Sequence, residues 1–366
     1  MNFIESIFEP IRKWYGRFER PISSLSLILG FIFDAVTLKR VDTLWENVWI
    51  LGHLVIVAVF IVLIHTTESK AGDEADPTKK HFWYVNILQF FFGGTLSVYL
   101  VFYFRSADIL VTWPFIFILA GAFWANESLK RHYVRLSFQI SLLFLSIYSF
   151  AIFLVPVVMH QIGPKVFLLS GFISIVLISL FLVILFYFTK DKFTESKRII
   201  LVSISSILVI VNFLYFTNLI PPIPLSLKDA GVYHSVFKNS AGNYEVTYED
   251  HSWRDYFTLY PNFTQVVGTP IYAFSAIFSP SGLNIVVIHE WQHYDETEKD
   301  WITQSEIYLS VVGGRDGGFR TYSKRDNLAP GKWRVKIKTK DDHIVGNLRF
   351  SIIDSDTEAV LSTEIK

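Results

Sequence analysis

The sequence predicts a polytopic membrane protein, in which an α-helical bundle of about seven transmembrane helices precedes an all-β antiparallel sandwich. The 366-residue chain has a mean hydropathy of +0.38 and only 18% charged residues, which is too apolar for a soluble domain of that length. Long apolar runs fill the first 220 residues, whereas short β-branched and aromatic runs separated by turn residues fill the rest. A lipid bilayer is therefore the expected solvent of the first part.

The predicted bundle consists of apolar segments, most of them long enough to cross roughly 30 Å of hydrocarbon at about 1.5 Å per residue. These segments are 22–38, 44–65, 82–104, 109–125, 133–159, 166–189 and 199–219. The first and the fourth are the shortest, with 17 residues each, and a re-entrant path of the fourth would change the number of crossings.

Basic residues divide unevenly between the two sets of connecting loops, with 14 Lys and Arg on one side and 4 on the other. Loops rich in Lys and Arg stay in the cytoplasm. We therefore expect a cytoplasmic N-terminus in a bacterial inner membrane. The seven crossings then place the C-terminal domain in the periplasm.

Four regions follow from these patterns. Residues 1–21 alternate apolar residues with Arg12, Lys13 and Arg17, which predicts an amphipathic helix on the membrane surface, with a helix packed on protein as the alternative. Residues 22–220 form the transmembrane domain, and 221–231 form a proline-rich connector that cannot continue a helix. Residues 232–366 form the extracytoplasmic β-sandwich, for which an immunoglobulin-like arrangement is one candidate.

Strand periodicity is clear in the segment KWRVKIKT at 332–339. Trp333, Val335 and Ile337 share one face, and the basic residues between them share the other. We expect the first face to be buried and the second to be solvated.

The segment His289-Glu290-Trp291-Gln292-His293 fits the H-E-x-x-H pattern of zinc hydrolases. On a helix, both histidines would face one zinc ion while Glu290 activated its water. The preceding β-branched run NIVVI favours a strand instead, which would send Glu290 to the face opposite His289 and His293. The two histidines are thus weak metal candidates, and no cofactor is expected.

Asp34 stands out within the first apolar segment because a lone carboxylate in hydrocarbon is costly unless it is paired, protonated or near a water-filled cavity. It lies close to Lys39 and Arg40, so an ion pair at the interface and a cavity inside the bundle are both open. Gly93 and Gly94 in the third segment and Gly121 in the fourth permit close approach of helices. Further polar residues lie in or beside the apolar segments, among them His53, Asn86, Gln89 and Asn126. Trp45 and Trp49 lie near a predicted membrane interface, which explains them without a ligand.

The composition excludes other classes of function. A net charge of zero without a basic block argues against nucleic-acid binding, and the absence of cysteine excludes thiol chemistry. Arg315, Arg320, Lys324 and Arg325 could form a basic patch for an anionic glycan or lipid headgroup, although a solvated strand face explains them equally well.

Several stretches resemble a family of bacterial multi-pass membrane proteins with a C-terminal domain of unknown function, the domain-of-unknown-function 2914 type. They are GFIFDAVTLKRVD, PPIPLSLKDAGVYH, IFSPSGLNIVVIHEW, GGFRTYSKRDNLAPGKWRVKIKT and VGNLRF. In this family the segment matching His289 and Trp291 looks like a strand without an obligatory glutamate. The resemblance implies no activity and no catalytic residue. It marks structural or binding candidates, which are Asp34, Tyr233, His234, His289, Trp291, Arg320, Ser323, Trp333 and Arg334.

Three functional hypotheses follow. In the first, which the sequence favours, the β-domain binds or senses an envelope glycan, lipid or protein while the bundle anchors it in the bilayer. In the second, the bundle is a transporter or a membrane-embedded enzyme, which requires a polar cavity around Asp34. In the third, a zinc hydrolase, His289 and His293 must lie on a helix. The sequence favours a role without enzymatic activity and leaves the ligand open.

Overall fold

The structure is a computed structural model. It describes residues 25, 28–38, 40–71, 82–128, 135–250, 258–266, 268–355 and 360–366. The predicted surface helix at 1–21 lies outside these residues. The described residues cluster into two compact units: one holds most of the helical bundle, and the other holds the β-strands together with the segments 103–115 and 153–169.

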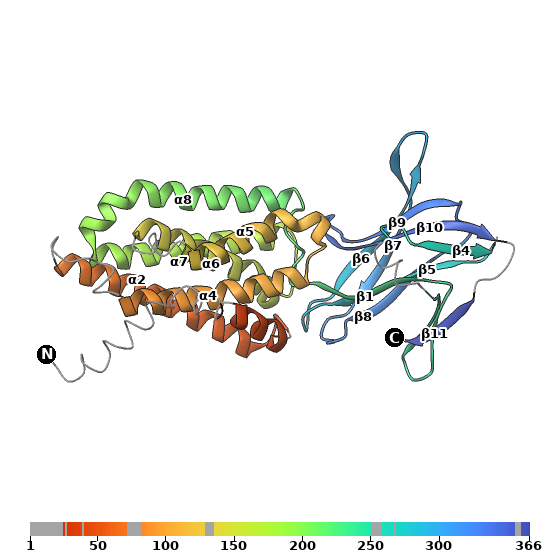
Figure 1. The fold of residues 1–366 in the computed structure, drawn as a ribbon, viewed down its shortest axis with the longest axis horizontal. Helices are drawn as coiled ribbons and strands as arrows, with labels where there is room; N and C mark the ends of the chain where they lie inside the picture. The colour runs from red at the N-terminus through yellow and green to blue at the C-terminus, as the bar shows by residue number, and fades with distance from the viewer. Residues whose placement is uncertain are drawn as a thin grey trace. The chain divides into compact units, whose positions relative to one another are not determined.

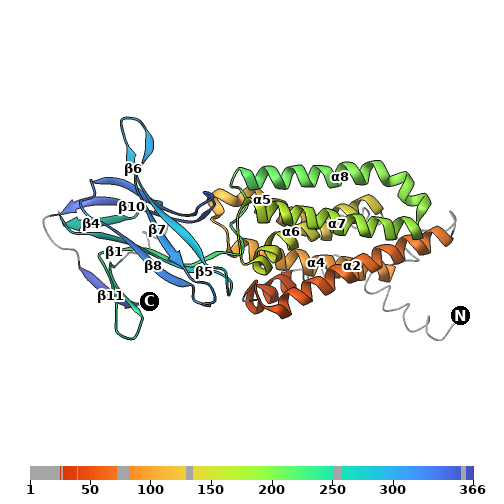
Figure 2. The ribbon, with the colours of Figure 1, turned by 180° about the vertical axis from the view of Figure 1, so that it is seen from behind.

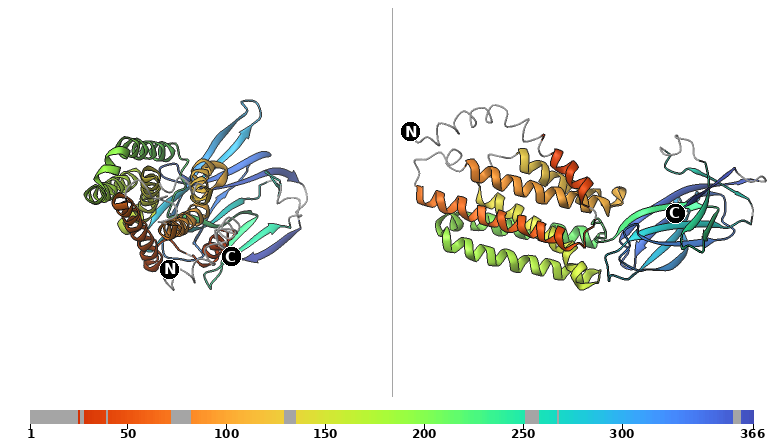
Figure 3. Two further views of the ribbon diagram at one scale, coloured as in Figure 1. Left: turned by 60° about the vertical axis from the view of Figure 1, so that its left-hand side comes forward. Right: turned by 90° about the horizontal axis from the view of Figure 1, so that it is seen from below.

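Six helices in the described part of the chain are long and apolar enough to cross a membrane. They are α2 (Leu44–Ala71), α4 (Phe82–Arg105), α5 (Ile109–Ser128), α6 (Leu136–Met159), α7 (Pro164–Phe188) and α8 (Lys190–Phe216). A shorter apolar helix, Ile28–Thr37, precedes them. The helices run side by side along their lengths (Figure 1 and Figure 3). The predicted helical bundle is thus confirmed.

The last helix begins earlier than the sequence analysis placed it. The sequence predicts a basic loop at 190–198, between the apolar segments 166–189 and 199–219. In the structure, α8 starts at Lys190 and carries Asp191 in its first turn. An acidic residue there is favourable because the start of a helix has a partial positive charge. The polar stretch 190–198 therefore forms the first turns of the helix and not a loop.

Hydrogen bonds between polar side chains join helices of the bundle to one another. His65 Nε2 lies 3.0 Å from Gln139 Oε1, which joins α2 to α6. Asn212 Nδ2 donates to the Tyr148 hydroxyl at 3.2 Å, which joins α8 to α6. In lipid, where apolar contact gives little drive for helices to associate, such bonds help to specify which helices pack together.

Eleven strands follow the bundle in the described chain. They are β1 (Ser226–Tyr233), β2 (Ser235–Lys238), β3 (Tyr244–Glu249), β4 (Asn262–Val266), β5 (Ile271–Phe278), β6 (Ile285–Asp295), β7 (Asp300–Val311), β8 (Phe319–Arg325), β9 (Gly331–Thr339), β10 (Ile344–Ser355) and β11 (Leu361–Ile365). The sheets have the orders β1-β5-β8, β4-β10-β9-β6-β7 and β11-β3-β2. β1 begins inside the segment that the sequence analysis gave to the connector, because only the residues up to Pro224 carry the proline block.

The core of the β-domain lies between the first two of these sheets. One cluster joins Ile271 and Ala273 of β5 to Trp291 of β6 and to Val335 of β9, and a second cluster joins Ile277 of β5 to the same larger sheet. Side chains from two sheets meeting in a shared core form a sandwich. The predicted β-domain is thus confirmed.

One strand pair departs from the predicted antiparallel arrangement. β4 pairs with β10 in parallel, with Asn262 opposite Ser351 and Val266 opposite Ser355, and Figure 2 shows the two strands side by side. A parallel pair needs a long connection, which the chain between β4 and β10 supplies. The domain is therefore mixed at this edge and antiparallel in its other strand pairs among the described residues.

Candidate functional site

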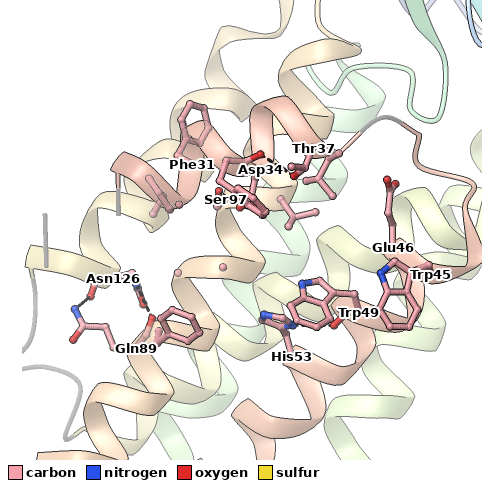
Figure 4. Close-up of a pocket in the computed structure, with 18 of the residues that line it drawn as sticks. Phe31, Asp34, Thr37, Trp45, Glu46, Trp49, His53, Gln89, Ser97 and Asn126 are labelled. Carbon is pink, nitrogen blue, oxygen red and sulfur yellow. Dashed lines mark hydrogen bonds between the residues drawn. The ribbon is translucent and has the colours of Figure 1, made fainter. Parts of the chain in front are cut away.

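A cavity of about 880 Å³ lies beside Asp34 in the helical bundle, and it opens to the outer surface of the bundle, where Trp45 and Phe90 of its lining are 73% and 70% exposed. The short helix Ile28–Thr37 and helices α2, α4 and α5 supply its walls. Its aromatic lining residues are Phe31, Phe33, Trp45, Trp49, Phe90 and Phe123, and its main polar lining residues are Asp34, Glu46, His53, Asn86, Gln89, Ser97 and Asn126. Figure 4 shows this mixture of rings and polar groups. The cavity is large enough for a small organic molecule.

Asp34 lies on the cavity wall and is held from the neighbouring helix α4. Ser97 Oγ donates a hydrogen bond of 2.5 Å to Asp34 Oδ2, across 63 positions of sequence (Figure 4). The competing ion pair with Arg40 does not form, because the Arg40 guanidinium makes two hydrogen bonds of 2.8 and 2.6 Å to Asp42. Lys39 lies outside the described residues. The carboxylate is thus directed into the bundle by a neutral donor.

His53 of α2 lines the same cavity in a fixed orientation. Its Nδ1 lies 2.9 Å from the Trp49 carbonyl oxygen, which makes Nδ1 the donor. Its ring packs between Trp49 and Phe91, with centroid distances of 4.8 and 4.9 Å. The other ring nitrogen, Nε2, makes no hydrogen bond with the described residues. It can accept a hydrogen bond from a ligand in the neutral ring and donate one in the charged ring.

Gly94 allows α4 to approach this histidine. A Cβ atom at position 94 would lie 3.4 Å from both Cδ2 and Nε2 of His53, which is van der Waals contact. The predicted close approach of helices is confirmed at Gly94, but not at Gly121, where a Cβ atom would meet nothing within 4 Å.

Gln89 and Asn126 close one end of the cavity by a reciprocal contact between α4 and α5. Gln89 Nε2 donates to the Asn126 carbonyl oxygen at 2.9 Å, and Asn126 Nδ2 donates to the Gln89 carbonyl oxygen at 3.1 Å. Both side chains are buried. This pair of hydrogen bonds fixes the two helices in register. The two amides therefore stabilise the wall of the cavity.

Most of the lining residues of α4 are polar or small, and Phe90 and Val98 lie among them. From Asn86 to Ser97 the helix rises about 16 Å, which is roughly half the thickness of the hydrocarbon core. The described residues that line the cavity include Asp34, Glu46 and His53 but no Lys or Arg. The site is therefore a long, aromatic and acidic cavity within the span of the bundle.

The β-domain contains a different polar group, a buried network centred on His289. Ser275 Oγ lies 2.9 Å from Nε2 of His289, and Ser323 Oγ lies 2.9 Å from Nδ1. Trp291 Nε1 donates to the same Ser323 oxygen at 3.0 Å. Burial lowers the pKa of His289 to about 4 because the charged ring has lost its water. The predicted candidates His289, Trp291 and Ser323 are thus brought together, but all are buried and they hydrogen-bond to one another.

The H-E-x-x-H segment lies on β6, as the β-branched run predicted. His289 and His293 therefore share a face, and Glu290 projects from the opposite one. The helical geometry that a zinc hydrolase needs is not present. His293 packs on Trp333 with ring centroids 4.7 Å apart, at the surface end of the strand.

Glu290 belongs to a charged cluster on the outer face of the larger sheet. Lys338 Nζ donates to the carboxylates of Glu290, Glu306 and Asp342 at 2.9, 3.0 and 3.0 Å. Burial alone would lower the pKa of Lys338, but these hydrogen bonds raise it well above its ordinary value. The basic face of β9 was expected to be solvated, and at Lys338 it is instead buried against carboxylates from β6 and β7.

The other predicted candidates take part in packing. Trp333 is buried in the core, and its Nε1 donates to the Ala329 carbonyl oxygen at 2.8 Å. Arg320 of β8 is half-buried, and its carbonyl oxygen accepts a hydrogen bond from the Tyr244 hydroxyl at 3.4 Å. Lys324, from the predicted basic patch, pairs with Asp326 at 3.2 Å.

Among the polar residues of the cavity, sequence reasoning identified Asp34, His53, Asn86, Gln89 and Asn126, and it missed Ser97 and Glu46. It assigned Trp49 to the membrane interface and not to a site beside His53. Part of the signal was visible, because Gln89, Gly93 and Ser97 recur at four-residue spacing and so share one helical face. The pairing of this stripe with Asp34 is a long-range contact, which no local pattern specifies.

Comparison with known proteins supports the assignment of the C-terminal domain. The family model described as "Protein of unknown function (DUF2914)" matches residues 285–352, which run from β6 into β10. Three of the five stretches that carry the resemblance overlap this match. No curated protein matches the chain.

Solved structures give only faint likenesses. A beta-glucosidase from Listeria innocua in complex with isofagomine is 9% identical, over 36% of this chain and 16% of its own, with a TM-score of 0.20. The alkylpurine DNA glycosylase AlkC of Pseudomonas fluorescens, bound to DNA containing an abasic site analog, is 8% identical over 84% of this chain and 98% of its own, with a TM-score of 0.21. TM-scores this low do not show a shared fold. Residues 285–352 of this chain are thus similar to the DUF2914 family, and helices long and apolar enough to cross a membrane precede them.

Proposed function

We propose that the bundle binds a small molecule in the Asp34 cavity as a step in carrying it through the membrane. The cavity itself is the observation that supports this proposal, because a bundle that only anchors a domain gains nothing from a space of about 880 Å³ lined by ionisable groups. A polar cavity around Asp34 was the requirement of the transport hypothesis. A bundle without a cavity at this position would have contradicted the transport hypothesis.

The energetics of the membrane favour the same conclusion. Carboxylate and imidazole groups in hydrocarbon cost free energy, so they are retained mainly where they face water, a partner or a ligand. The Asp34 carboxylate accepts a hydrogen bond from Ser97, and Nε2 of His53 has none among the described residues. Each therefore keeps hydrogen-bonding capacity directed at a ligand.

Water access to the cavity is the experiment that tests this proposal. The natural chain contains no cysteine, so each single-cysteine variant has one reactive thiol. We expect Thr37→Cys and Asn86→Cys, which replace two lining residues, to react with a water-soluble methanethiosulfonate reagent in permeabilised membranes. The thiolate is the reactive form, and it needs water to exist.

Two matched variants give the limits of the measurement. Ser240→Cys in an exposed turn between β2 and β3 sets the rate for full access, and Val183→Cys on the outer surface of α7, where Val183 is 69% exposed, sets the rate for a lipid-facing thiol. Rates at positions 37 and 86 close to the rate at 240 support the proposal. Rates as slow as that at 183 reject it.

A second candidate function, binding of an envelope component by the β-domain, is favoured by a half-exposed cluster at the β6–β7 hairpin. Trp301 packs on Tyr294 and Tyr260 with centroid distances of 5.2 and 6.0 Å, and the Arg334 guanidinium lies 4.3 Å from the Trp301 ring. Aromatic surface beside a guanidinium suits an anionic glycan. Loss of co-sedimentation with purified peptidoglycan in Trp301→Ala supports this candidate if Ile302→Ala, on the opposite face of β7, binds normally. Equal binding by all forms, or by none, excludes it.

This second candidate also requires the bundle to lie in a bacterial inner membrane and the β-domain to lie in the periplasm. The distribution of Lys and Arg predicts this arrangement. A fusion of alkaline phosphatase after residue 366 should then be active, and a fluorescent protein that folds only in the cytoplasm should be dark at the same position. The reverse pattern would place the domain in the cytoplasm and remove its proposed role in the envelope.

A further inference from the structure

We infer that the Asp34 cavity selects an organic cation, meaning a molecule that bears one positive charge on an apolar body. This inference rests on the proposed function of the cavity and adds the chemical class of its ligand. Three independent features of the lining support it: its charge, its aromatic surface and its size.

The charge of the lining favours a cation. Asp34 and Glu46 contribute carboxylates from two different helices, and the described lining residues include no Lys or Arg. The nearest basic residue in sequence that the structure describes, Arg40, is bonded to Asp42. A carboxylate in a medium of low polarity is stabilised strongly by a counter-ion, so a bound cation beside Asp34 would be held more tightly than a neutral molecule of the same shape.

The aromatic surface suits the same ligand. Trp45 and Trp49 follow one another by one helical turn of α2, with ring centroids 6.4 Å apart. Trp45 is 73% exposed, and Trp49 is 54% exposed. The faces of indole rings attract cations, and they attract quaternary ammonium-type ions well because these carry little hydration. Trp49 also packs on His53, which keeps its ring in place.

The size of the cavity excludes the smallest cations as its main ligand. A volume of about 880 Å³ lies in the range of sites that hold drug-sized organic molecules. A bare metal ion or a proton would leave most of this space, and most of the aromatic lining, without contact. A lipid acyl chain could fill the space, but it would bring no charge to the carboxylate of Asp34.

A pair of probe ions with the same shape and opposite charge tests the inference. Tetraphenylphosphonium and tetraphenylborate have nearly the same size and apolar surface, and they differ in the sign of the charge. In the full chain carrying Thr37→Cys, we expect tetraphenylphosphonium to protect the thiol from the methanethiosulfonate reagent. We expect tetraphenylborate not to protect it at the same concentration. Ser240→Cys reports any effect of the probes on the reagent itself.

The role of the carboxylate is tested in the same background. Asp34→Asn should weaken protection by tetraphenylphosphonium about tenfold or more, since it removes the charge while keeping the shape. Ser97→Ala removes the hydrogen bond to Asp34 but leaves the carboxylate, so it should keep the preference for the cation. If Asp34→Asn fails to fold, Glu46→Gln provides a second test with the same expected direction.

The outcomes separate the inference from the function on which it rests. Protection by the cation alone, lost in Asp34→Asn and kept in Ser97→Ala, supports both. Equal protection by both ions, protection by the anion alone, or a reactive thiol in Thr37→Cys that neither ion protects overturns the cation preference and leaves a water-accessible cavity. A thiol in Thr37→Cys that is as unreactive as the lipid-facing thiol in Val183→Cys overturns both.

Discussion

Two histidines show how differently the bundle and the β-domain use polar groups in apolar surroundings. In the β-domain, both ring nitrogens of His289 lie 2.9 Å from serine hydroxyl groups, and the ring is fully buried. In the bundle, His53 uses one nitrogen to bond the Trp49 carbonyl oxygen and turns its remaining edge to a cavity. The first arrangement pairs both ring nitrogens within the protein, whereas the second pairs one and leaves the other beside a cavity.

The two regions also differ in how much hydrogen-bonding capacity their polar side chains leave unused. The sequence drew attention to His289, Trp291 and Ser323, which prove to satisfy one another inside a packed core. Asp34 and His53 keep free capacity around a space of about 880 Å³. A buried polar network of the first kind specifies a core, whereas one of the second kind is expected at a binding site.

The largest difference between the two regions is expected on removing a tryptophan from each. Trp291→Ala, at a fully buried position of the β-domain, should lower the free energy of unfolding by about 3–5 kcal/mol, because it removes a large core side chain and leaves a cavity. Trp45→Ala, at a position 73% exposed in the bundle, should leave stability nearly unchanged and weaken binding of tetraphenylphosphonium. Thermal unfolding of both variants of the full chain checks this. Similar losses of stability would remove the contrast.

A pH dependence is expected from the β-domain histidine. Folding holds the pKa of His289 at about 4, whereas the unfolded chain binds the proton near the ordinary histidine pKa of 6.5. The unfolded state therefore gains stability as the pH falls from 6.5 to 4, which lowers the free energy of unfolding by about 3 kcal/mol over that range and by no more below it. The difference between the pH profiles of the wild type and His289→Gln isolates this effect. Parallel profiles would contradict it.

The charged cluster on the outer face of the sheet should give a smaller effect. Lys338→Met leaves the carboxylates of Glu290, Glu306 and Asp342 without their shared cation and should cost about 2 kcal/mol. This is less than for a fully buried pair, because Asp342 and Glu306 reach water. The matched variant Lys332→Met, whose exposed ammonium lies 3.7 Å from Glu296, should change stability by less than about 0.5 kcal/mol. Urea unfolding measures both, and equal effects would show that burial of Lys338 is unimportant.

The smallest expected effect concerns the shape of the cavity. Gly94→Ala places a methyl group 3.4 Å from the His53 ring, which is ordinary contact, and should preserve ligand binding within about twofold. Gly94→Leu places a bulky side chain on the cavity wall beside the ring and should weaken binding of tetraphenylphosphonium about tenfold, or about 1.4 kcal/mol. Normal binding by the leucine variant would mean that His53 does not shape the site.

Much of the fold was predictable because it depends on local patterns. Apolar length predicted the helices, and alternation predicted β9, where Trp333, Val335 and Ile337 are buried as expected. The β-branched run before His289 indicated a strand, which the structure confirms.

The site was predictable only in part because it depends on long-range contacts. Asp34 was identified from the cost of a charge in lipid, but its partner Ser97 lies 63 residues away and could not be identified from spacing. The same limit applies to the parallel pair of β4 with β10 and to the burial of Lys338, since both depend on strands distant in sequence. Periodicity indicates which face of a helix or strand is buried, but it does not indicate which other element packs against that face.

The most direct test of the central claim is a comparison of water content at two positions of the bundle. Nitroxide spin labels at residues 37 and 183 of the reconstituted full chain, studied in heavy water by electron spin echo envelope modulation, report the deuterium density around each label. A hydrated cavity beside Asp34 predicts strong deuterium modulation at 37 and weak modulation at 183, with addition of tetraphenylphosphonium reducing the first. Equally weak modulation at both positions would show a dry bundle and contradict the account.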